Sequence, residues 1–577
     1  MGKEASEDRG RRFAFNANTR NIESISAGPA IGMAFCESAG ICDIIDSNTR
    51  WDRSQRVLSP GMAAKAVLAT MYTHNNKRAL RNIRGFHNYG PVDVTFSAYA
   101  DHDSFNDVTI GRGVDTMYSA DLETLYYTVA SRVKAQFGIV SRHLNLDQSD
   151  IEITRDPNSE YIDLPEDMPR PMLGKSKKGH LDRLKYNFCG GVDDNGFLMY
   201  FRTYSGNVTD NRMDAAALRF LEDVLTDERI VATADCKVVT REMVDSFIWN
   251  NIPFVSKCPE NFGECVKQRV IDDAIAKGFV PIGRIGNRKN DPCIEVCDFS
   301  ETANGDVLRF VAYREVGVKH SLEYYRTQVA KEVDRIIGAS MKKRFACDDD
   351  VRLEYERILK KVGDRPYVLS MSSSCTMVPK SKRGRGRPKK DAVLEMKEER
   401  RISVTKGFSE TDALKLAEWR DIRVIVTSLP RLDPSQYSES PSDTDREPID
   451  GATAADVVKV YRGQWRIERC FRDMKTDLGA DEVFFESPKR EATMPFLIAL
   501  AVMTRNLMQN LLRKAAKEGM RIPADIPASA ALESIQNVTV RFDRSAGEVY
   551  LDGPNDETAR VISYCKALGI EPSQLIR

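Results

Sequence analysis

The 577-residue sequence lacks any run of about 18 apolar residues, the length that a membrane-spanning helix requires, so we expect no membrane span. Its opening segment, Met1–Arg12, has no apolar core of the kind that a secretory signal contains. Net charge is also absent, because 85 basic residues balance 85 acidic ones. This balance argues against a generic polyanion binder, although local basic patches matter more than the sum for nucleic-acid binding.

The cysteines and histidines show no spacing typical of metal ligands. The twelve cysteines are spread from Cys36 to Cys565, which predicts reduced and mostly buried thiols in a long chain without an export signal. Four of them lie between Cys258 and Cys297, with spacings that fit no strong zinc pattern. The six histidines show no ligand spacing either. We therefore expect no structural zinc site.

Periodic apolar residues predict a helical N-terminal region that ends near residue 140. Gly61–His74 and Val114–Phe137 both repeat apolar residues every three or four positions, and Asp115 is a plausible cap for the second helix. Ser104–Asp115 is expected to connect the two helices.

The pattern then changes to strands and helices in an order typical of an α/β fold. Three strands come first, with a hairpin turn at Asp193–Gly196 between the second and the third. A helix, a short buried strand, a second helix and a last strand follow, and Thr209 or Asp210 is expected to cap the first helix. The predicted ranges are His143–Ile153, Leu184–Val192, Phe197–Tyr204, Asn211–Leu225, Ile230–Ala234, Thr240–Asn250 and Pro253–Lys257.

A long inserted segment follows this part of the chain. Between Asp235 and Glu468 lie 232 residues, far more than one crossover needs, so we expect an inserted domain. Its predicted elements are strands at Ile294–Phe299 and Val307–Arg314 and a helix at Ser321–Lys343. Ser372–Ser403 is predicted to be a linker, because it is poor in apolar periodicity and rich in Lys, Arg, Gly and Ser. After Lys475 we expect helix as far as about Lys517, and a hairpin at Val538–Leu551.

Tyr461–Lys475 reads as one helix that carries two stripes. At about 100° per residue, its apolar residues fall on one narrow face and its polar residues on the face beside it. The apolar stripe consists of Val460, Ile467, Cys470, Phe471, Met474 and Leu478. The polar stripe consists of Tyr461, Gln464, Glu468, Arg472 and Lys475. A carboxylate flanked by a phenol and an ammonium suits a site for metal and phosphate, although a solvated helix surface has the same pattern.

The spacing of Tyr461, Glu468 and Lys475 resembles the Tyr-(2)-Arg-(3)-Glu-(6)-Lys signature of prokaryotic insertion-sequence transposases of the DDE type, in the insertion sequence 4-like family. Gln464 stands where many members have Arg. The resemblance implies an α/β fold: a ribonuclease H-like catalytic core, an N-terminal helical domain, and a β-rich insertion between the second and third acidic residues. The expected division is an N-terminal domain for DNA-end recognition at 1–140, the core at 141–260 and 451–518, the insertion at 261–450 with a basic linker at 376–395, and a C-terminal region at 519–577.

Such an enzyme moves a phosphodiester between oxygens. Two divalent cations about 3.5–4 Å apart, Mg²⁺ or Mn²⁺, can activate the nucleophile and stabilise the leaving alkoxide. These hard ions prefer carboxylate oxygens, so three acids should meet at one sheet edge.

The third acid is Glu468, and the second is Asp235. Asp235 ends the apolar run Ile230–Asp235, and ligands bind at the carboxyl ends of strands in open α/β sheets. A helix cap is the alternative role for Asp235. The first acid is Asp147 or Asp150, and only one of them can be a ligand because they point to opposite faces of a strand. We favour Asp147, since Leu144–Ser149 resembles the corresponding family segment.

The expected DNA contacts come from the signature helix and from two basic patches, the first at Lys175–Lys185 and the second at Lys380–Lys390. The loop Gly174–Asp182 resembles a family segment and would contact phosphate, or else is simply solvated. Arg385–Pro388, inside the second patch, resembles an AT-hook that lies in an A·T minor groove. A solvated basic linker is the alternative, and nuclear targeting is disfavoured by the prokaryotic family. The predicted contacts are Tyr461, Gln464, Trp465, Arg472, Lys475, Lys177, Lys178, Arg183, Arg385 and Arg387.

The resemblance as a whole implies a DNA transposase. It would bind the terminal inverted repeats of its element, cleave them and join them to target DNA, as a homodimer on DNA in a prokaryotic cytoplasm, associated with the nucleoid. Two other functions stay open. One is a catalytically inactive DNA-binding remnant, against which the presence of all three acids speaks. The other is a ribonuclease H-like nuclease that cuts without joining.

Overall fold

The computed structural model describes residues 22–54, 57–72, 90–153, 168–177, 179–234, 241–260, 262, 266–285, 291–303, 306–316, 322–379, 396–432, 451–478, 482–483 and 487–576. The chain is mixed α/β and divides into two units. The first unit comprises Met1–Pro259, Thr427–Gly451 and Lys459–Arg577, and the second comprises Glu260–Val426 and Ala452–Val458.

The N-terminal part of the first unit is helical, as its apolar periodicity predicts. Its helices are α1 (Ala27–Ser38), α2 (Ile41–Asn48), α3 (Pro60–Met71), α4 (Val92–Thr95), α5 (Asp107–Met117) and α6 (Leu122–Gln136). No single helix in the described ranges is long and apolar enough to cross a membrane. The pair α1 and α2, bent by 58°, passes that test together by length and composition alone.

The helix predicted over Val114–Phe137 is in fact two helices, α5 and α6. The predicted connector Ser104–Asp115 is wrong for most of its length, because α5 already begins at Asp107. The Asn106 side chain accepts the first free N–H groups of α5, and Asp121 does the same for α6. Asp115, the predicted cap, lies inside α5. Two local caps therefore divide one apolar pattern into two helices.

A mixed sheet forms the centre of the first unit. Its main strands, in spatial order, are β5 (Leu198–Ser205), β4 (Leu184–Asp193), β2 (His143–Ile153), β6 (Val231–Ala234) and β7 (Phe254–Lys257). The β4 strand runs antiparallel to β2 and to β5, whereas β2, β6 and β7 are parallel. Two short strands pair with the ends of interior strands: β3 (Met172–Leu173) pairs with β4, and β14 (Glu482–Val483) pairs with β2. The strands and helices predicted from the residue pattern are confirmed here, within a few residues at each end.

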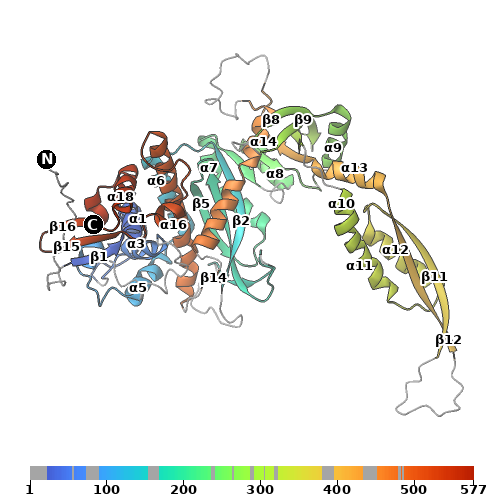
Figure 1. Ribbon diagram of the computed structural model, residues 1–577, viewed down its shortest axis with the longest axis horizontal. Coiled ribbons are helices and arrows are strands. Elements are labelled where there is room, and N and C mark those ends of the chain that lie inside the picture. The colour runs from blue at the N-terminus through green and yellow to red at the C-terminus, as the bar shows by residue number, and fades with distance from the viewer. Residues whose placement is uncertain are drawn as a thin grey trace, which may run out of the picture. The chain divides into compact units, whose positions relative to one another are not determined.

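Helices cover both faces of this sheet. On one face α7 (Asp210–Asp227) packs, with the ring of Phe220 at 5.8 Å from that of Tyr200. Phe201, the next residue along β5, faces the other way, toward Tyr126 of α6 at 5.8 Å. Figure 1 shows α6 and α16 (Pro488–Lys517) beside β5 on that side. Farther along the sheet, α8 (Arg241–Trp249) stacks Phe247 on Phe254 of β7.

The C-terminal residues return to the N-terminal strand. The predicted hairpin at Val538–Leu551 is confirmed as β15 (Thr539–Asp543) and β16 (Glu548–Asp552), and β1 (Ile22–Ser26) pairs with β15. The remaining elements are α17 (Ala528–Glu533), α18 (Asn555–Leu568) and a 3₁₀ turn at Pro572–Ile576.

The second unit is mixed rather than largely β. Its strands outside the long hairpin are β8 (Val280–Arg284), β9 (Cys293–Ala303), β10 (Asp306–Glu315) and β13 (Arg423–Thr427). Its helices are α9 (Val266–Lys277), α10 (Leu322–Tyr324), a π-helical turn at Tyr325–Val329, α11 (Ala330–Met341), α12 (Asp348–Val362) and α13 (Glu410–Asp421). The strands predicted near β9 and β10 are confirmed, and so is the long helix predicted over Ser321–Lys343. The expectation of a β-rich insertion left out these helices.

A long hairpin replaces most of the predicted linker. β11 (Tyr367–Pro379) and β12 (Met396–Phe408) pair antiparallel along their whole length. The linker prediction is therefore wrong at residues 372–379 and 396–403, while residues 380–395 lie outside the described part of the chain. Ser and Thr are tolerated in strands, and only the base of this hairpin has an apolar face to bury, so the sequence shows little strand alternation.

Candidate functional site

The segment predicted as one signature helix is divided into three pieces. α14 (Ala454–Arg462) ends before Gly463, α15 (Trp465–Arg472) follows, and a π-helical turn continues over Asp473–Asp477. Gly463 lies in the break because a Cβ there would come within 2.8 Å of the Val460 carbonyl oxygen and 3.6 Å of Asn145 Oδ1 on β2. A turn without a side chain thus lets the chain approach the sheet closely.

The α15 helix has one buried face and one exposed face, as predicted. Ile467, Cys470 and Phe471 are buried. Trp465, Glu468 and Arg472 are exposed at spacings of three and four residues, so they share one side of the helix. Trp465 is 52% exposed, with the Arg466 guanidinium 5.1 Å from its ring centre. The exposed face therefore presents an aromatic ring, a carboxylate and a cation.

Phe471 anchors α15 on the sheet. Its ring packs edge-on against Phe188 of β4 at 5.0 Å. Two residues further on the same face lies Gly190, where a Cβ would come within 2.8 Å of the Phe471 ring. Gly190 thus leaves space for the edge of the Phe471 ring and lets α15 lie close to β4.

Asp147 lies on the sheet face that α15 covers. The register of β2 and β4 places Asp147 directly opposite Gly190, and residues paired in this way project from the same face. Asp147 is partly exposed, whereas the nine residues that flank it in β2, at 144–146 and 148–153, are buried. The other partly exposed residue of the strand is His143 at its start. The strand therefore brings one carboxylate to the surface beside the helix that carries Glu468.

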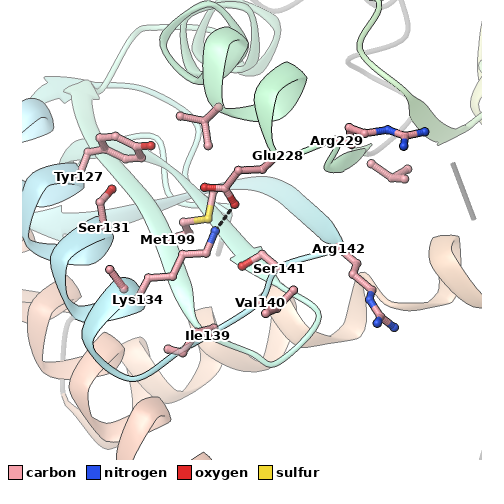
Figure 2. Close-up of a pocket in the computed structure, with 13 residues that line it drawn as sticks. Tyr127, Ser131, Lys134, Ile139, Val140, Ser141, Arg142, Met199, Glu228 and Arg229 are labelled. Atoms are coloured by element: carbon pink, nitrogen blue, oxygen red, sulfur yellow. Dashed lines mark hydrogen bonds and ion pairs between the residues drawn. The ribbon is translucent and has the colours of Figure 1, made fainter. Parts of the chain in front are cut away.

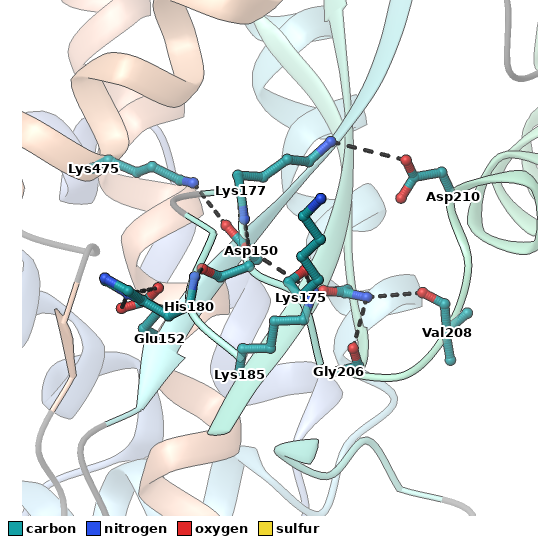
Figure 3. Close-up of polar contacts among 12 residues, drawn as sticks. Asp150, Glu152, Lys175, Lys177, His180, Lys185, Gly206, Val208, Asp210 and Lys475 are labelled. Carbon is teal, nitrogen blue, oxygen red and sulfur yellow. Dashed lines mark hydrogen bonds and ion pairs between the residues drawn. The ribbon is translucent and has the colours of Figure 1, made fainter. Parts of the chain in front are cut away.

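Asp150 projects from the opposite face and is held by cations. Its carboxylate lies 3.1 Å from Lys475 Nζ and 3.8 Å from Lys185 Nζ, and it accepts the Lys177 backbone N–H at 2.7 Å. Figure 3 shows Lys475 and Lys177 converging on this carboxylate. Asp150 is only 4% exposed. These contacts occupy Asp150 as a counter-ion and favour Asp147 as the first acid.

The loop Gly174–Asp182 is fastened to the same end of β2. Besides the Lys177 contact, His180 Nδ1 lies 2.8 Å from a Glu152 oxygen, and Arg183 lies 3.0 Å from the other. These ties leave the Lys177 side chain half-exposed, 3.9 Å from Asp210 at the start of α7. The loop is thus a fixed, basic surface beside the carboxyl end of β2.

One lysine and one carboxylate in this cluster, Lys185 and Glu152, were not among the predicted site residues. Lys185 is mostly buried, its ammonium donates to the Lys175 carbonyl at 2.9 Å, and burial lowers its pKa. Glu152 is 3% exposed and ion-paired. The only signal in the sequence was that each of these charged residues lies within a predicted strand. A charged side chain on a buried face of a strand requires a partner.

Oxygen atoms line the sheet beneath the turn at Gly463. Asn145 of β2 and Thr233 of β6 pair in register and are 1% and 0% exposed. Within the described part of the chain, Asn145 Oδ1 and Thr233 Oγ1 have no hydrogen-bond partner. Asn145 lies two residues before Asp147 on the same face. Unpaired buried oxygens next to a carboxylate suit a hard cation or its bound water.

The structure places only part of the predicted site. Asp235 follows Ala234, the last residue of β6, and lies outside the described residues, as do Lys178, Arg385 and Arg387. Among the residues that are described, no group of three His, Cys, Asp or Glu side chains is close enough to hold a metal ion. Tyr461 and Gln464 are half-buried beside the break before α15. The Gly206–Asp210 turn is tight, because a Cβ at Gly206 would lie 2.0 Å from the Lys185 carbonyl oxygen.

A cavity of 510 Å³ lies away from these residues. It opens between α6, α7 and the chain that enters β2, and Figure 2 shows Lys134 reaching Glu228 across it. Ser141 and Arg142, which precede β2, line one side. The cavity is therefore at the amino end of β2, whereas the Asp150 cluster is at its carboxyl end.

Comparison with known families supports a transposase function. Residues 320–504 match the family described as the transposase DDE domain. Residues 27–131 match a domain of unknown function, DUF4277. No curated protein matches the chain. The DDE match includes Glu468 and Lys475 but begins at residue 320, so Asp147 and Asp235 lie N-terminal to it.

Proposed function

We propose that the protein is a DNA transposase of the DDE type, which cleaves the ends of its insertion sequence and joins them to target DNA. The observation that carries this proposal is the position of Asp147. It is a partly exposed carboxylate in an otherwise buried strand, on the face covered by the helix that presents Glu468. The match of residues 320–504 to a transposase DDE domain supports the same reading.

The strand arrangement of the first unit supports a ribonuclease H-like core. Three antiparallel strands, β2, β4 and β5, are followed by β6 and β7 parallel to β2, in the spatial order β5–β4–β2–β6–β7. The parallel strands β2 and β6 run in the same direction; β6 ends at Ala234, and β2 continues to Ile153. Asn145 of β2 pairs with Thr233 of β6. In the sequence, Asp147 lies two positions after Asn145, and Asp235 lies two positions after Thr233. This spacing favours Asp235 as the second acid.

We propose that Asp147, Asp235 and Glu468 hold two Mg²⁺ or Mn²⁺ ions. Their carboxylates, with the unpaired oxygens of Asn145 and Thr233 nearby, are the donors that hard cations prefer. Bound ions supply Lewis acidity for the attacking water or 3′ hydroxyl and for the leaving oxygen. The chain itself orients these carboxylates, because Phe471 fixes α15 on β4 and the strand pairing fixes Asp147.

The DNA lies, in this proposal, across the exposed face of α15 and the loop tied to β2. Lys475, Lys177 and Arg183 supply positive charge, and Trp465 offers a surface on which a displaced base stacks. Arg472 extends this face. Tyr461 and Gln464 flank it, and Lys178, Arg385 and Arg387 are further proposed contacts.

We also propose that the N-terminal helices of residues 1–140 recognise the element end, and that residues 261–450 are an insertion within the core formed by 141–260 and 451–518. Residues 519–577 form the C-terminal region. Pairing two element ends requires two active sites, so the proposed assembly is a homodimer on DNA, acting at the prokaryotic nucleoid.

The test is cleavage of a plasmid that carries the DNA flanking the reading frame. With Mg²⁺ the purified chain should nick this plasmid and join the ends to a second plasmid, and EDTA should stop both reactions. Asp147→Asn and Glu468→Gln should lose nicking and joining, while Glu518→Gln, an exposed carboxylate at the end of α16, should keep both. Full activity of Glu468→Gln would refute the mechanism. Binding without nicking would indicate a remnant, and nicking without joining a nuclease.

A further inference from the structure

The β11–β12 hairpin extends beyond the helices of its own unit as a two-stranded ribbon. Its register runs from Tyr367 paired with Phe408 to Pro379 paired with Met396. Thirteen residues per strand at about 3.3 Å each make the ribbon about 43 Å long. Figure 1 shows it leading away from α11 and α12. An isolated pair of strands is marginal in water, so a ribbon of this length requires a surface to bind.

The two faces of the ribbon differ in chemistry. The inward face packs at its base on α11, α12 and α13, and Ile402 and Val404 are buried there. The outward face is exposed and consists mainly of small hydroxyl side chains. These are Ser370, Ser372, Ser374, Thr376, Ser403 and Thr405. Arg401 lies among them opposite Ser374 and is also exposed.

Charge separates this hairpin from the rest of the chain. From 367 to 408 the sequence holds eleven Lys or Arg and four Asp or Glu, a net charge of 11 − 4 = +7. The whole chain is neutral, so the remaining residues together carry −7. The β11 strand contains no charged residue. Glu399, the one acid on the outward face, is buried and paired with Arg344 at 3.1 Å and Lys397 at 3.0 Å.

We propose that the outward face of the β11–β12 ribbon lies along the sugar–phosphate backbone of double-stranded DNA. A two-stranded ribbon fits the width of a DNA groove, and its length covers about one helical turn. Serine and threonine hydroxyls donate to phosphate oxygens, and Arg401 pairs with a phosphate. Small side chains let the backbone approach closely along the whole face. Arg401 on this face favours a polyanion as the partner, and so does the net charge of +7 over residues 367–408, of which the two strands themselves carry 4 − 2 = +2.

This assignment takes its partner class from the proposed function but concerns a different surface. The ribbon belongs to the second unit and contains none of the proposed catalytic acids. Contacts to the backbone carry no sequence information, so the ribbon adds affinity for any duplex and does not select the element end.

The alternative occupant is a second copy of this chain, paired along β11. An uncharged edge strand invites such pairing, whereas charged residues on β12 and the bridge between Phe345 and Arg400 protect the other edge. Edge pairing uses backbone groups and leaves the hydroxyl face free, so the two occupants respond differently to substitutions on that face.

The test compares Ser372→Glu with Ser373→Glu in the full-length chain. These neighbours make the same charge change on opposite faces of the ribbon. Duplex affinity is measured by fluorescence anisotropy over a range of salt concentrations, with thermal melts as a check on folding. Ser372→Glu should weaken binding at least about tenfold, on an element-end duplex and on an unrelated duplex alike, and Ser373→Glu less than about twofold. Arg401→Gln should reduce the slope of log affinity against log salt by about one.

Equal losses in Ser372→Glu and Ser373→Glu, or none in either, would overturn the proposal. A change of oligomeric state in sedimentation, with duplex affinity intact, would assign the ribbon to a second copy instead. Nicking by Ser372→Glu at saturating DNA separates the two proposals. If the catalytic site works independently of the ribbon, the Ser372→Glu variant still nicks DNA. If the wild-type chain does not nick DNA, the transposase proposal is refuted, and the result on the ribbon remains valid.

Discussion

Replacing Gly190 by alanine tests how α15 is held on the sheet. The added Cβ would lie 2.8 Å from Phe471 Cε1 and 3.1 Å from Cζ, where ordinary contact begins at 3.4 Å. The first overlap is therefore 3.4 − 2.8 = 0.6 Å. Leu198 at 3.4 Å leaves no free space on the other side. Overpacking of this kind costs about 1–3 kcal/mol.

The ring of Phe471 relieves this overlap only by moving away from β4. Phe471 and Glu468 belong to the same helix, so the movement also shifts the Glu468 carboxylate relative to Asp147. Misplacement of a reacting group by about 1 Å can lower a rate about a hundredfold. We therefore expect Gly190→Ala to lower nicking by about tenfold or more, together with its loss of stability.

Urea denaturation and plasmid nicking measure the two effects. Gly338→Ala is the matched control, because Gly338 lies in α11 with nothing within 4 Å of the added Cβ, and it should leave nicking unchanged. Phe471→Leu combined with Gly190→Ala should recover part of the stability, since the smaller side chain gives the Cβ space. Wild-type stability and wild-type nicking in Gly190→Ala would refute the reasoning.

Three further predictions concern charged groups. Asp150→Asn should cost about 2–4 kcal/mol in urea, because Lys475 and its neighbours lose a buried counter-charge, yet the folded variant should still nick DNA where Asp147→Asn does not. Burial raises the pKa of Asp193 from 3.8 to about 6. Protonation of this carboxyl therefore adds to the free energy of unfolding; the contribution is complete below about pH 4 and is lost as the pH rises through 6. The unfolding free energy of the wild type relative to Asp193→Asn should fall by about 3 kcal/mol between pH 4 and 7; a flat difference would contradict this. Lys65→Ala should cost about 3 kcal/mol in thermal melts, because the buried ammonium contacts Glu37 at 2.6 Å and the Thr95 carbonyl at 2.7 Å; a loss below about 1 kcal/mol would contradict it.

The core of the first unit could be read from the sequence because its elements have strong local patterns. Leu184–Asp193 is buried at every position, and Asp193–Gly196 is a turn sequence, so both strands of the hairpin were predictable. The break at Gly463 was not. The residues on either side keep helical periodicity, and the reason for the break is the approach of the chain to Asn145, a contact between residues over 300 positions apart.

The choice between Asp147 and Asp150 also depended on distant contacts. Both are acids in one strand, and the alternation of faces shows only that they differ. What distinguishes them is Lys475, 325 positions away in the sequence, and the Lys177 backbone, neither of which the local pattern predicts as a partner. The ribbon was missed for a different reason. Over Ser370–Thr376 its outward face consists of Ser and Thr, and its inward face includes the polar Ser373, so apolar and polar residues barely alternate.

The two faces of β2 carry separate duties on one backbone. Asp147 opens toward α15, and Asp150, three residues on, holds Lys475 on the reverse side. Insertion or deletion of a single residue before Asp147 would turn each carboxylate to the wrong side at once. In the proposed transposase, such a change would remove Asp147 from the catalytic face and Asp150 from Lys475 in one step, so the length of β2 is constrained by both faces at once.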